Sequence, residues 1–519
     1  MAWIPSVRRR FTPLLDEFRV NLSRPDAMLQ LALLGILSGL LAGGIIVVFR
    51  LGVEGVQSHF LPGGSSENFE DLPVAVRFLL PIAGALVIAA CFAVLGKGQK
   101  VVGLLHVMER LAYHQGYLSL RGLVLQFVGA GVAIASGHSV GREGPSVHLG
   151  AASSSQLGQY LALPNNSIRT LVGCGTAAAI AAAFNTPLAG VIFALEVVMM
   201  EYTLASFTPV ILAAVSATAV SRLVYGSAMA FDVPALSFVS LSELPYVFIL
   251  GVACGIAASI FVVLVRVSAQ RSSGLPFWLR LCLAGVVVGA CAIPYPQVMG
   301  IGYDTVTGAL LGQLAFGVLI GVAIAKLIAT AACVGLGVPA GLIGPTLVAG
   351  ACLGGVAGLL ARYVHPDQLS HIGLYALLGM GAMMGAVLQA PLAALVAVFE
   401  LTGNPNIILP GMLAIVTAGL TSRELFGNRS VFLALLKLRD LDYRNDPVMQ
   451  ALRRIGVANV MERDVKRHDR MLSRTEAEDL VAAEPTWILI DVDSEPKALM
   501  PAVDLVRALQ ENEEETLDL

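Results

Sequence analysis

The sequence predicts an all-α membrane protein with many spans, an internal repeat and a small α/β tail. Hydrophobic residues make up 56% of the 519 residues and charged residues only 13%, and the mean hydropathy is +0.78. A soluble domain of this composition would have too few charged residues to cover its surface. The net charge is −3, and basic residues occur only in small clusters such as residues 8–10. We therefore expect no nucleic-acid partner.

The apolar residues are concentrated in long runs along the chain. These runs are 28–49, 76–95, 171–200, 205–224, 245–268, 277–294, 315–340, 341–361, 374–400 and 406–422. Most are long enough for a helix to cross a hydrocarbon layer of about 30 Å, which takes about 20 residues. The lipid bilayer is therefore an expected partner, and residues 28–437 form the predicted transmembrane domain.

The distribution of basic residues predicts the orientation of the chain. The N-terminal stretch MAWIPSVRRRFTPLLDEF has no signal-peptide pattern, and its basic residues favour the cytoplasmic side. Residues 58–73 contain no Lys or Arg, whereas the next loop carries Lys97 and Lys100, and residues 423–454 are again basic. We expect a multi-pass protein of the cell (plasma or inner) membrane with both termini in the cytoplasm. Residues 1–27 are expected to hold an amphipathic helix on the inner surface.

Two pairs of segments in the chain resemble each other. GREGPSVHLGA (141–151) matches GLIGPTLVAGA (341–351), and residues 171–196 match residues 377–400 with Pro187 aligned to Pro391. Both matches have offsets of 200 to 206 residues. The sequence therefore predicts two halves of one ancestral unit, at about 76–225 and 277–437. Repeated halves with Gly/Pro-interrupted segments are typical of transporters and channels.

Each Gly-Pro element is suited to the start of a helix beside an anion. Proline is tolerated in the first helical turn, where its missing N–H has no helical partner. Glycine allows the backbone to bend and to approach a ligand closely. The free N–H groups and the positive end of the helix dipole then form an anion site without a cationic side chain.

GREGP, GLIGP and AAAFNTPLAGVIFALE together resemble the CLC family of chloride channels and anion/proton antiporters. The resemblance covers roughly residues 28–437. It implies a homodimer with one anion pathway per subunit, and two inverted halves of tilted, partly re-entrant helices. It implies transport of chloride or related anions and no enzymatic activity.

The resemblance assigns roles to individual residues. Glu143 of GREGP would be the gating glutamate, whose carboxylate competes with the anion and leaves when it is protonated. The backbone N–H groups of Leu342 and Ile343 would contact the central anion, although Ile343 replaces the family's usual phenylalanine. The full set expected to bind the anion is Val102, Gly103, Arg142, Gly144, Leu342, Ile343, Gly344 and Phe432.

Three further positions depart from the family pattern. Val102 replaces the serine and Phe432 the tyrosine that normally donate hydroxyl hydrogen bonds to the central anion. A hydrogen bond to a charged partner contributes roughly 1.5–3 kcal/mol, so weaker anion binding is expected. Val197 stands where coupled antiporters have the inner proton-relay glutamate. These departures favour passive transport that is not coupled to protons.

Two alternatives remain open at this point. The chain could be a chloride/proton antiporter that uses Glu201, His106 or a water chain as its proton route. It could also be a non-conducting anion sensor whose tail signals. Retention of the GREGP glutamate argues against the sensor.

Three further ionisable residues lie within apolar runs. Glu196 and Glu400 are symmetric in the repeat, and we expect them to bond free backbone N–H groups at a helix break. Lys326 stands alone in its run, and it either snorkels, pairs or lines the anion path.

Residues 438–519 form a tail with a different composition. WILIDVD predicts a buried strand and ALMPAVDLVRAL an amphipathic helix, which together resemble a single, partial CBS-like unit. Nucleotide binding normally needs a cleft between two such units, so we expect none here. The acidic end ENEEETLDL is expected to lack structure. The seven cysteines are scattered singly and predict no disulfide and no metal site. We expect no cofactor, with chloride as the bound substrate ion.

Overall fold

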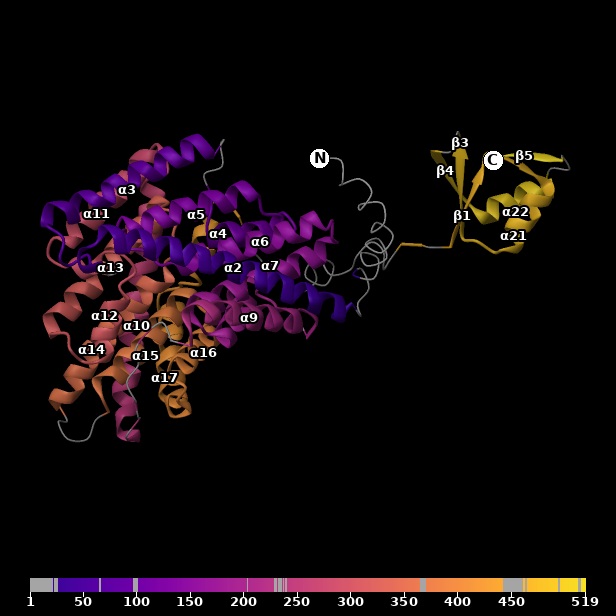
Figure 1. The fold of residues 1–519 in the computed structure, drawn as a ribbon. Coiled ribbons are helices and arrows are strands. Elements are labelled where there is room, and N and C mark those ends of the chain that lie inside the picture. Colours follow the sequence, from indigo (N-terminus) through magenta and orange to yellow (C-terminus); the bar gives the residue numbers. More distant parts are fainter. Residues whose placement is uncertain are drawn as a thin grey trace. The chain divides into compact units, whose positions relative to one another are not determined.

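The computed structural model describes most of the chain in two compact units (Figure 1). The described residues are 22, 27–64, 67–96, 101–202, 204–227, 231, 236, 238, 240–364, 370–441, 461–462, 464–492, 495–511 and 515–519. The two units are Met1–Pro447 and Val448–Leu519, and the division predicted at 437/438 falls ten residues before their boundary. The amphipathic helix expected within residues 1–27 lies outside the described residues.

The larger unit is helical. Its first-half helices are α2 (Met28–Phe60), α3 (Val74–Leu95), α4 (Leu104–Tyr113), α5 (Leu120–Ala135), α6 (Glu143–Tyr160), α7 (Asn165–Phe184), α8 (Pro187–Phe193), the π-helix η2 (Ala194–Met199) and α9 (Leu204–Tyr225). They are followed by α10 (Leu244–Arg271), α11 (Phe277–Ala292), α12 (Tyr303–Leu310), α13 (Phe316–Leu336), α14 (Ile343–Val364), α15 (Ile372–Leu388), α16 (Pro391–Thr402), α17 (Ile408–Leu420), the π-helix η6 (Thr421–Leu425) and α18 (Val431–Lys437). Single 3-10 turns are η1 (Pro62–Gly64), η3 (Leu241–Glu243), η4 (Pro296–Val298) and η5 (Pro405–Ile407). Within the described residues, eight helices are long and apolar enough to cross a membrane, which confirms the predicted fold class.

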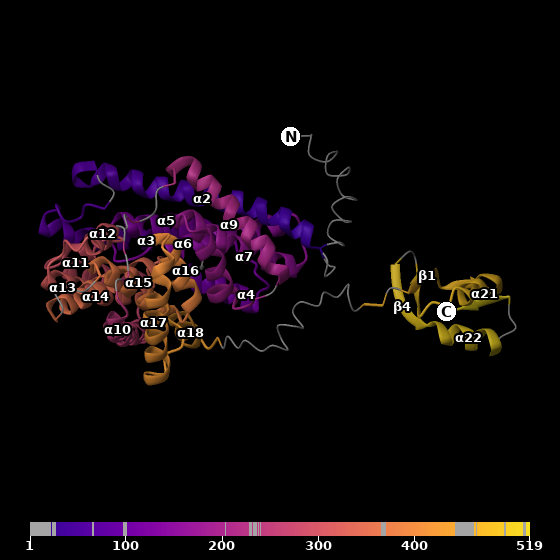
Figure 2. The ribbon, with the colours of Figure 1, turned by 90° about the horizontal axis from the view of Figure 1, so that it is seen from below.

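The two repeats pack their central helices in the same way. Helix α6 crosses α7 where Gly150 faces Gly175, and α14 crosses α15 where Gly350 faces Gly379. A Cβ on Gly150 would lie 2.2 Å from the Gly175 carbonyl oxygen, and one on Gly350 would lie 2.4 Å from that of Gly379. Both crossings therefore need glycine, because the backbones touch. Figure 2, a view turned by 90°, shows α6 and α7 of one half and α14 and α15 of the other.

The apolar runs at 171–200 and 374–400, which include the ends of α7 and α15, are each interrupted by a break between two helices. Asn185 follows the last residue of α7 and Gln389 follows the last residue of α15, and both have a left-handed backbone, with φ of 59° and 55°. Two residues later, Pro187 and Pro391 begin α8 and α16. The run expected at 171–200 is thus a helix, a break and a shorter helix that packs against its counterpart, since α8 contacts α16.

The smaller unit is the α/β tail. Its strands are β1 (Val465–Asp469), β2 (Met471–Ser473), β3 (Trp487–Val492), β4 (Glu495–Pro501) and β5 (Thr516–Asp518), and its helices are α21 (Arg474–Ala482) and α22 (Ala502–Glu511). The sheet order is β1-β3-β4, with β1 parallel and β4 antiparallel to β3, and β2 pairs with β5.

Two expectations for the tail are wrong. Residues 498–501 belong to strand β4, so the amphipathic helix begins only at Ala502. The end of the acidic segment is ordered, because residues 516–518 pair with β2 and Leu517 is buried among the apolar residues of this unit.

Candidate functional site

The starts of α6 and α14 meet at one point in the larger unit. Gly141 N donates to Gly341 O at 2.8 Å, and Gly341 N donates to Gly141 O at 2.9 Å. A Cβ on Gly144 would lie 2.7 Å from the Gly341 Cα, which no side chain could tolerate without a shift. The two Gly-Pro elements, 200 residues apart in sequence, are therefore joined at the bases of two helices whose N-termini face a common centre.

The carboxylate of Glu143 occupies this centre. The residue is fully buried at the first position of α6. Its Oε2 accepts a hydrogen bond from the Gly344 backbone N–H at 3.0 Å, and its Oε1 accepts one from the Tyr303 hydroxyl at 2.5 Å. One carboxylate oxygen thus takes an amide at the start of the opposite repeat's helix, a position where the dipole favours negative charge.

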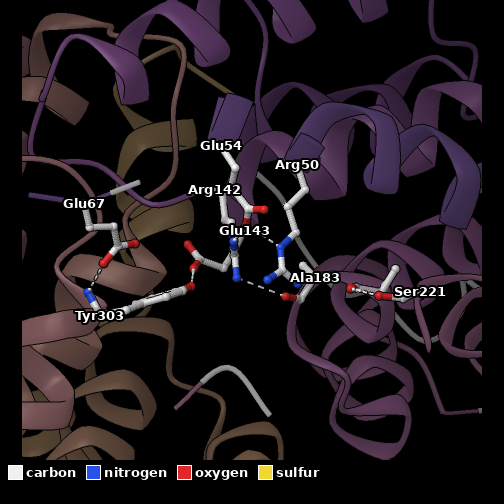
Figure 3. A network of polar contacts seen from close by, with 9 residues as sticks. Arg50, Glu54, Glu67, Arg142, Glu143, Ala183, Ser221 and Tyr303 are labelled. Carbon is white, nitrogen blue, oxygen red and sulfur yellow. Dashed lines mark hydrogen bonds and ion pairs between the residues drawn. The ribbon is translucent and has the colours of Figure 1, made fainter. Parts of the chain in front are cut away.

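The guanidinium of Arg142 points into a polar network with Glu54 and the Ala183 carbonyl (Figure 3). Its Nη1 lies 3.5 Å from Glu54 Oε1, and its Nη2 donates to the Ala183 carbonyl at 3.3 Å. Arg50 also binds Glu54, at 2.6 Å, and the Arg142 guanidinium lies 5.0 Å from the centroid of the Tyr303 ring. Arg142 therefore pairs with an acid, Glu54.

Tyr303 was not identified from the sequence. Two sets of contacts fix its backbone N–H and the turn that precedes it. Its N–H donates to Glu67 Oε2 at 3.0 Å (Figure 3). The buried Lys326 donates from Nζ to the carbonyls of Val298 and Gly300, both at 3.0 Å. Lys326 therefore pairs with the backbone that leads into Tyr303, and it does not snorkel. The only local signal for this turn is the Gly-Ile-Gly sequence before Tyr303, in which Gly300 and Gly302 have positive φ.

A cavity of about 710 Å³, here called the vestibule, opens beside the joined helix starts. Six of the residues expected to bind the anion line it: Val102, Gly103, Gly144, Leu342, Ile343 and Phe432. Residues from α4, α6, α14 and α18, and from the segments that precede them, are thereby brought together from distant parts of the sequence. Arg142 and Gly344 are not among the lining residues; Gly344 instead contacts the Glu143 carboxylate.

The charged side chains in the described lining of the vestibule are basic. Its described lining includes two arginines, Arg280 on α11 and Arg439 after α18, and no aspartate or glutamate. Arg280 Nη2 is 3.5 Å from the Gly335 carbonyl, and Arg439 Nη1 is 3.7 Å from Glu109 Oε2. Two cations in a concave wall attract anions. Sequence reasoning did not identify them, because neither arginine lies near a Gly-Pro element in the chain.

Val197 and the two symmetric glutamates lie at the broken helices. Val197 is buried in η2. Its neighbour Glu196 accepts hydrogen bonds from the Leu392 and Ala393 N–H groups at 3.2 and 2.6 Å. Reciprocally, Glu400 accepts from the Leu188 and Ala189 N–H groups at 2.9 and 2.7 Å. The glutamates therefore satisfy free N–H groups at helix starts, as expected from their symmetry.

Comparison with known proteins gives one family. The model of the family described as voltage gated chloride channel matches residues 83–423. The ClcB-like protein of Ralstonia nicotianae is 36% identical over 383 residues, which cover 72% of this chain and 89% of that protein. The H(+)/Cl(−) exchange transporter ClcA of Vibrio cholerae is 28% identical, covering 81% of this chain and 92% of its own.

Solved structures have the same fold. A slow cyanobacterial Cl⁻/H⁺ antiporter superposes with a TM-score of 0.69 at 23% identity, covering 80% of this chain and 99% of its own. A eukaryotic CLC transporter superposes with a TM-score of 0.67 at 22% identity, covering 93% of this chain and 89% of its own.

Proposed function

Because the chain belongs to the CLC family, the voltage-gated chloride channel family, we propose that it moves chloride passively across the cell membrane, with Glu143 as the gate. As a member of this family the chain transports anions and is not an enzyme. The observation that best supports the gate is the hydrogen bond from the Gly344 N–H to the Glu143 carboxylate. The carboxylate is a tethered anion at a site built from helix starts, so a mobile anion can replace it there.

The vestibule supplies the route to this gate. Its arginines raise the local anion concentration, and the backbone of Gly144, Leu342 and Ile343 forms its wall beside the helix starts. Val102 and Phe432 present no hydroxyl to a central anion, so binding there is weak. Weak binding favours rapid conduction, because an ion must leave as readily as it arrives.

The absence of proton coupling rests on Val197. A valine side chain cannot bind or release a proton. Its neighbour in η2, Glu196, already accepts hydrogen bonds from backbone N–H groups at the start of α16. Antiport is the second candidate function, because the ClcA relatives are named as exchangers and the gating glutamate is retained.

The membrane orientation and oligomeric state belong to the same proposal. Arg280, Arg439 and Lys437 lie at or near the vestibule, so we infer that the vestibule opens to the cytoplasm and that both termini lie there. The gate and the vestibule are completed by one chain, so a homodimer would contain two separate pathways.

A flux assay tests this proposal. The full chain is reconstituted in liposomes with a chloride gradient, and chloride efflux and internal pH are recorded together. We expect efflux without uphill proton movement. Glu143→Gln should conduct without pH dependence. The control Glu243→Gln changes a different fully buried carboxylate, which accepts three hydrogen bonds, and its chloride flux should remain pH-dependent. Uphill proton movement would establish the antiporter, and no efflux from either wild type or Glu143→Gln would favour the sensor.

A further inference from the structure

A carboxylate from a distant part of the chain caps the start of α12. Glu67 lies in the loop between α2 and α3, and its Oε2 accepts hydrogen bonds from the N–H groups of Tyr303 at 3.0 Å (Figure 3) and Asp304 at 3.4 Å. These are the first two N–H groups of the helix, which have no partner within it. The residue before them, Gly302, has no side chain that could cap the helix, so Glu67 supplies the cap.

The capped helix begins with the residue that contacts the gate. Tyr303 is the first residue of α12, and its hydroxyl donates to Glu143 Oε1 at 2.5 Å. The turn before it contains two glycines with positive φ, and because glycine is permissive, backbone preference alone does not fix the direction of this turn. Contacts fix it instead: Lys326 holds two carbonyls of the turn, and Glu67 holds the first N–H of the helix.

The ring of Tyr303 has other neighbours, but none of these contacts sets its distance from Glu143 closely. The Phe231 ring meets it edge-on with centroids 4.8 Å apart, and the Phe184 ring is tilted at 6.4 Å. The Arg142 guanidinium lies 5.0 Å from its centroid. Such ring contacts tolerate a small shift of the phenol, whereas a hydrogen bond weakens steeply with distance and angle. The hydroxyl contact therefore depends on how well the backbone of α12 is anchored.

The charged groups around Glu67 come from four other segments. They are Asp304 of α12, Arg142 at the start of α6, Lys326 of α13, and Arg50 and Glu54 of α2, which line the same cavity of about 20 Å³ as Glu67. Burial and the charge of Asp304 raise the pKa of the Glu67 carboxyl above its ordinary 4.5, against the lowering effect of Arg142 and of the N–H groups. The anchor therefore loses its charge at a higher pH than an exposed glutamate would.

We propose that Glu67 is a positioning residue of the gate, whose carboxylate anchors the start of α12 so that the Tyr303 hydroxyl stays on Glu143. The proposal rests on the proposed function, because it takes Glu143 as the gate. A neutral Glu67 accepts the N–H groups more weakly and no longer interacts as an anion with the helix dipole. The helix start then shifts, the hydroxyl leaves the Glu143 carboxylate, and chloride competes more easily for the Gly344 N–H.

A direct electrostatic effect of Glu67 on the gate would have the opposite sign. Loss of the Glu67 charge removes a negative charge from the surroundings of Glu143, which favours its ionised form and a closed gate. Loss of the anchor removes the hydrogen bond from Tyr303, which favours the protonated form and an open gate. The direction in which the pH profile of chloride flux moves therefore identifies how Glu67 acts.

The test is chloride efflux from liposomes that contain the full chain, measured over a series of pH values. Glu67→Gln removes the charge and keeps the length of the side chain, whereas Glu67→Asp keeps the charge and shortens the side chain. We expect both variants to raise efflux at pH 7 by about fivefold, and to move the pH of half-maximal efflux upward. Glu70→Gln is the matched control, because Glu70 lies in the same loop and also feels the charge of Asp304, and its profile should equal that of wild type.

A double variant tests whether Tyr303 carries the effect. Glu67→Gln combined with Tyr303→Phe should move chloride at the rate of Tyr303→Phe alone, within about twofold, because substitutions that act through one contact are not additive. Fully additive effects would overturn the proposal. Efflux from both Glu67 variants at or below that of wild type, or a downward shift of the pH profile, would overturn it too.

Other outcomes of the same assay decide the proposed function. If wild type moves no chloride, or if Glu143→Gln keeps the pH dependence, the proposed function is wrong and the role of Glu67 falls with it. If wild type and Glu143→Gln behave as expected and both Glu67 variants match wild type, only the role of Glu67 is wrong. Should Glu67→Gln fail to fold, Glu67→Asp alone decides the outcome.

Discussion

The Tyr303 hydroxyl donates a 2.5 Å hydrogen bond to the Glu143 carboxylate, which joins the start of α12 to the start of α6. The two residues are 160 positions apart in the chain. Tyr303 is itself fixed through its backbone by Glu67 and through the preceding turn by Lys326. The phenol therefore holds the Glu143 carboxylate beside the Gly344 N–H, and its own backbone is fixed.

Tyr303→Phe should open the gate. A hydrogen bond to a charged group contributes roughly 1.5–3 kcal/mol, so its loss should raise chloride flux at neutral pH by about tenfold or more. The measurement is chloride efflux from liposomes at pH 7. Tyr375→Phe is the matched control, because it removes a phenol that donates to the buried Glu243 at 2.8 Å, and its flux should equal that of wild type. A Tyr303→Phe flux equal to or below that of wild type would contradict the proposal that the Tyr303 hydroxyl holds the Glu143 carboxylate in place.

Gly341→Ala should separate the two helix starts. Its Cβ would lie 2.6 Å from Gly144 N and 2.9 Å from Gly141 O, both backbone atoms that cannot move independently. We expect loss of most chloride flux, because the amides that face the carboxylate would be displaced. Gly44→Ala, at which a Cβ meets nothing within 4 Å, should keep wild-type flux in the same efflux assay. Normal flux in Gly341→Ala would show that the close approach is unnecessary for transport.

Much of the fold could be predicted because its signals are local. The Gly-Pro elements and the broken helices recur at fixed offsets, and the structure joins Gly141 to Gly341 and pairs Glu196 with the start of α16. Val102 was located by counting back from the GREGP element and Phe432 by its place in the last helical segment, and both line the vestibule.

The remaining site residues depend on tertiary contacts that leave no pattern in the chain. Tyr303 and Arg280 reach the gate region from α12 and α11, and nothing near them in sequence indicates an anion. The acidic end was wrongly expected to lack structure because most of its residues are charged or polar. One apolar residue, Leu517, is nevertheless buried when β5 pairs with β2.

Acid should loosen the β2–β5 pair of the tail. The hydrogen bonds from Arg470 to Asp518 lower the pKa of that carboxyl from its ordinary 3.8. Because the folded pKa is depressed, the stabilisation is present above pH 3.8 and is lost as pH falls through the lower folded value. Hydrogen exchange of residues 516–518 in the full chain, corrected for intrinsic rates, should therefore increase below about pH 4. Arg470→Ala should show the faster exchange already at pH 7. Exchange that is independent of Arg470 would contradict this account.

Glu196→Ala and Glu400→Ala should destabilise the protein to a similar extent. Each carboxylate accepts hydrogen bonds from two backbone N–H groups at the start of the other repeat's short helix, one exposed and one partly buried, so either substitution leaves both donors unpaired. An unsatisfied buried donor costs about 1–3 kcal/mol, and we expect a loss in this range for each variant, from the partly buried N–H. Thermal unfolding of the purified protein in detergent measures the change. Glu424→Ala is the control, because its side chain is 65% exposed, and it should unfold at the wild-type temperature. If only one of the two glutamate variants were destabilised, the two reciprocal sets of hydrogen bonds would not contribute equally to stability. Only the carboxylate whose loss destabilises the protein would then stabilise the helix start that it contacts.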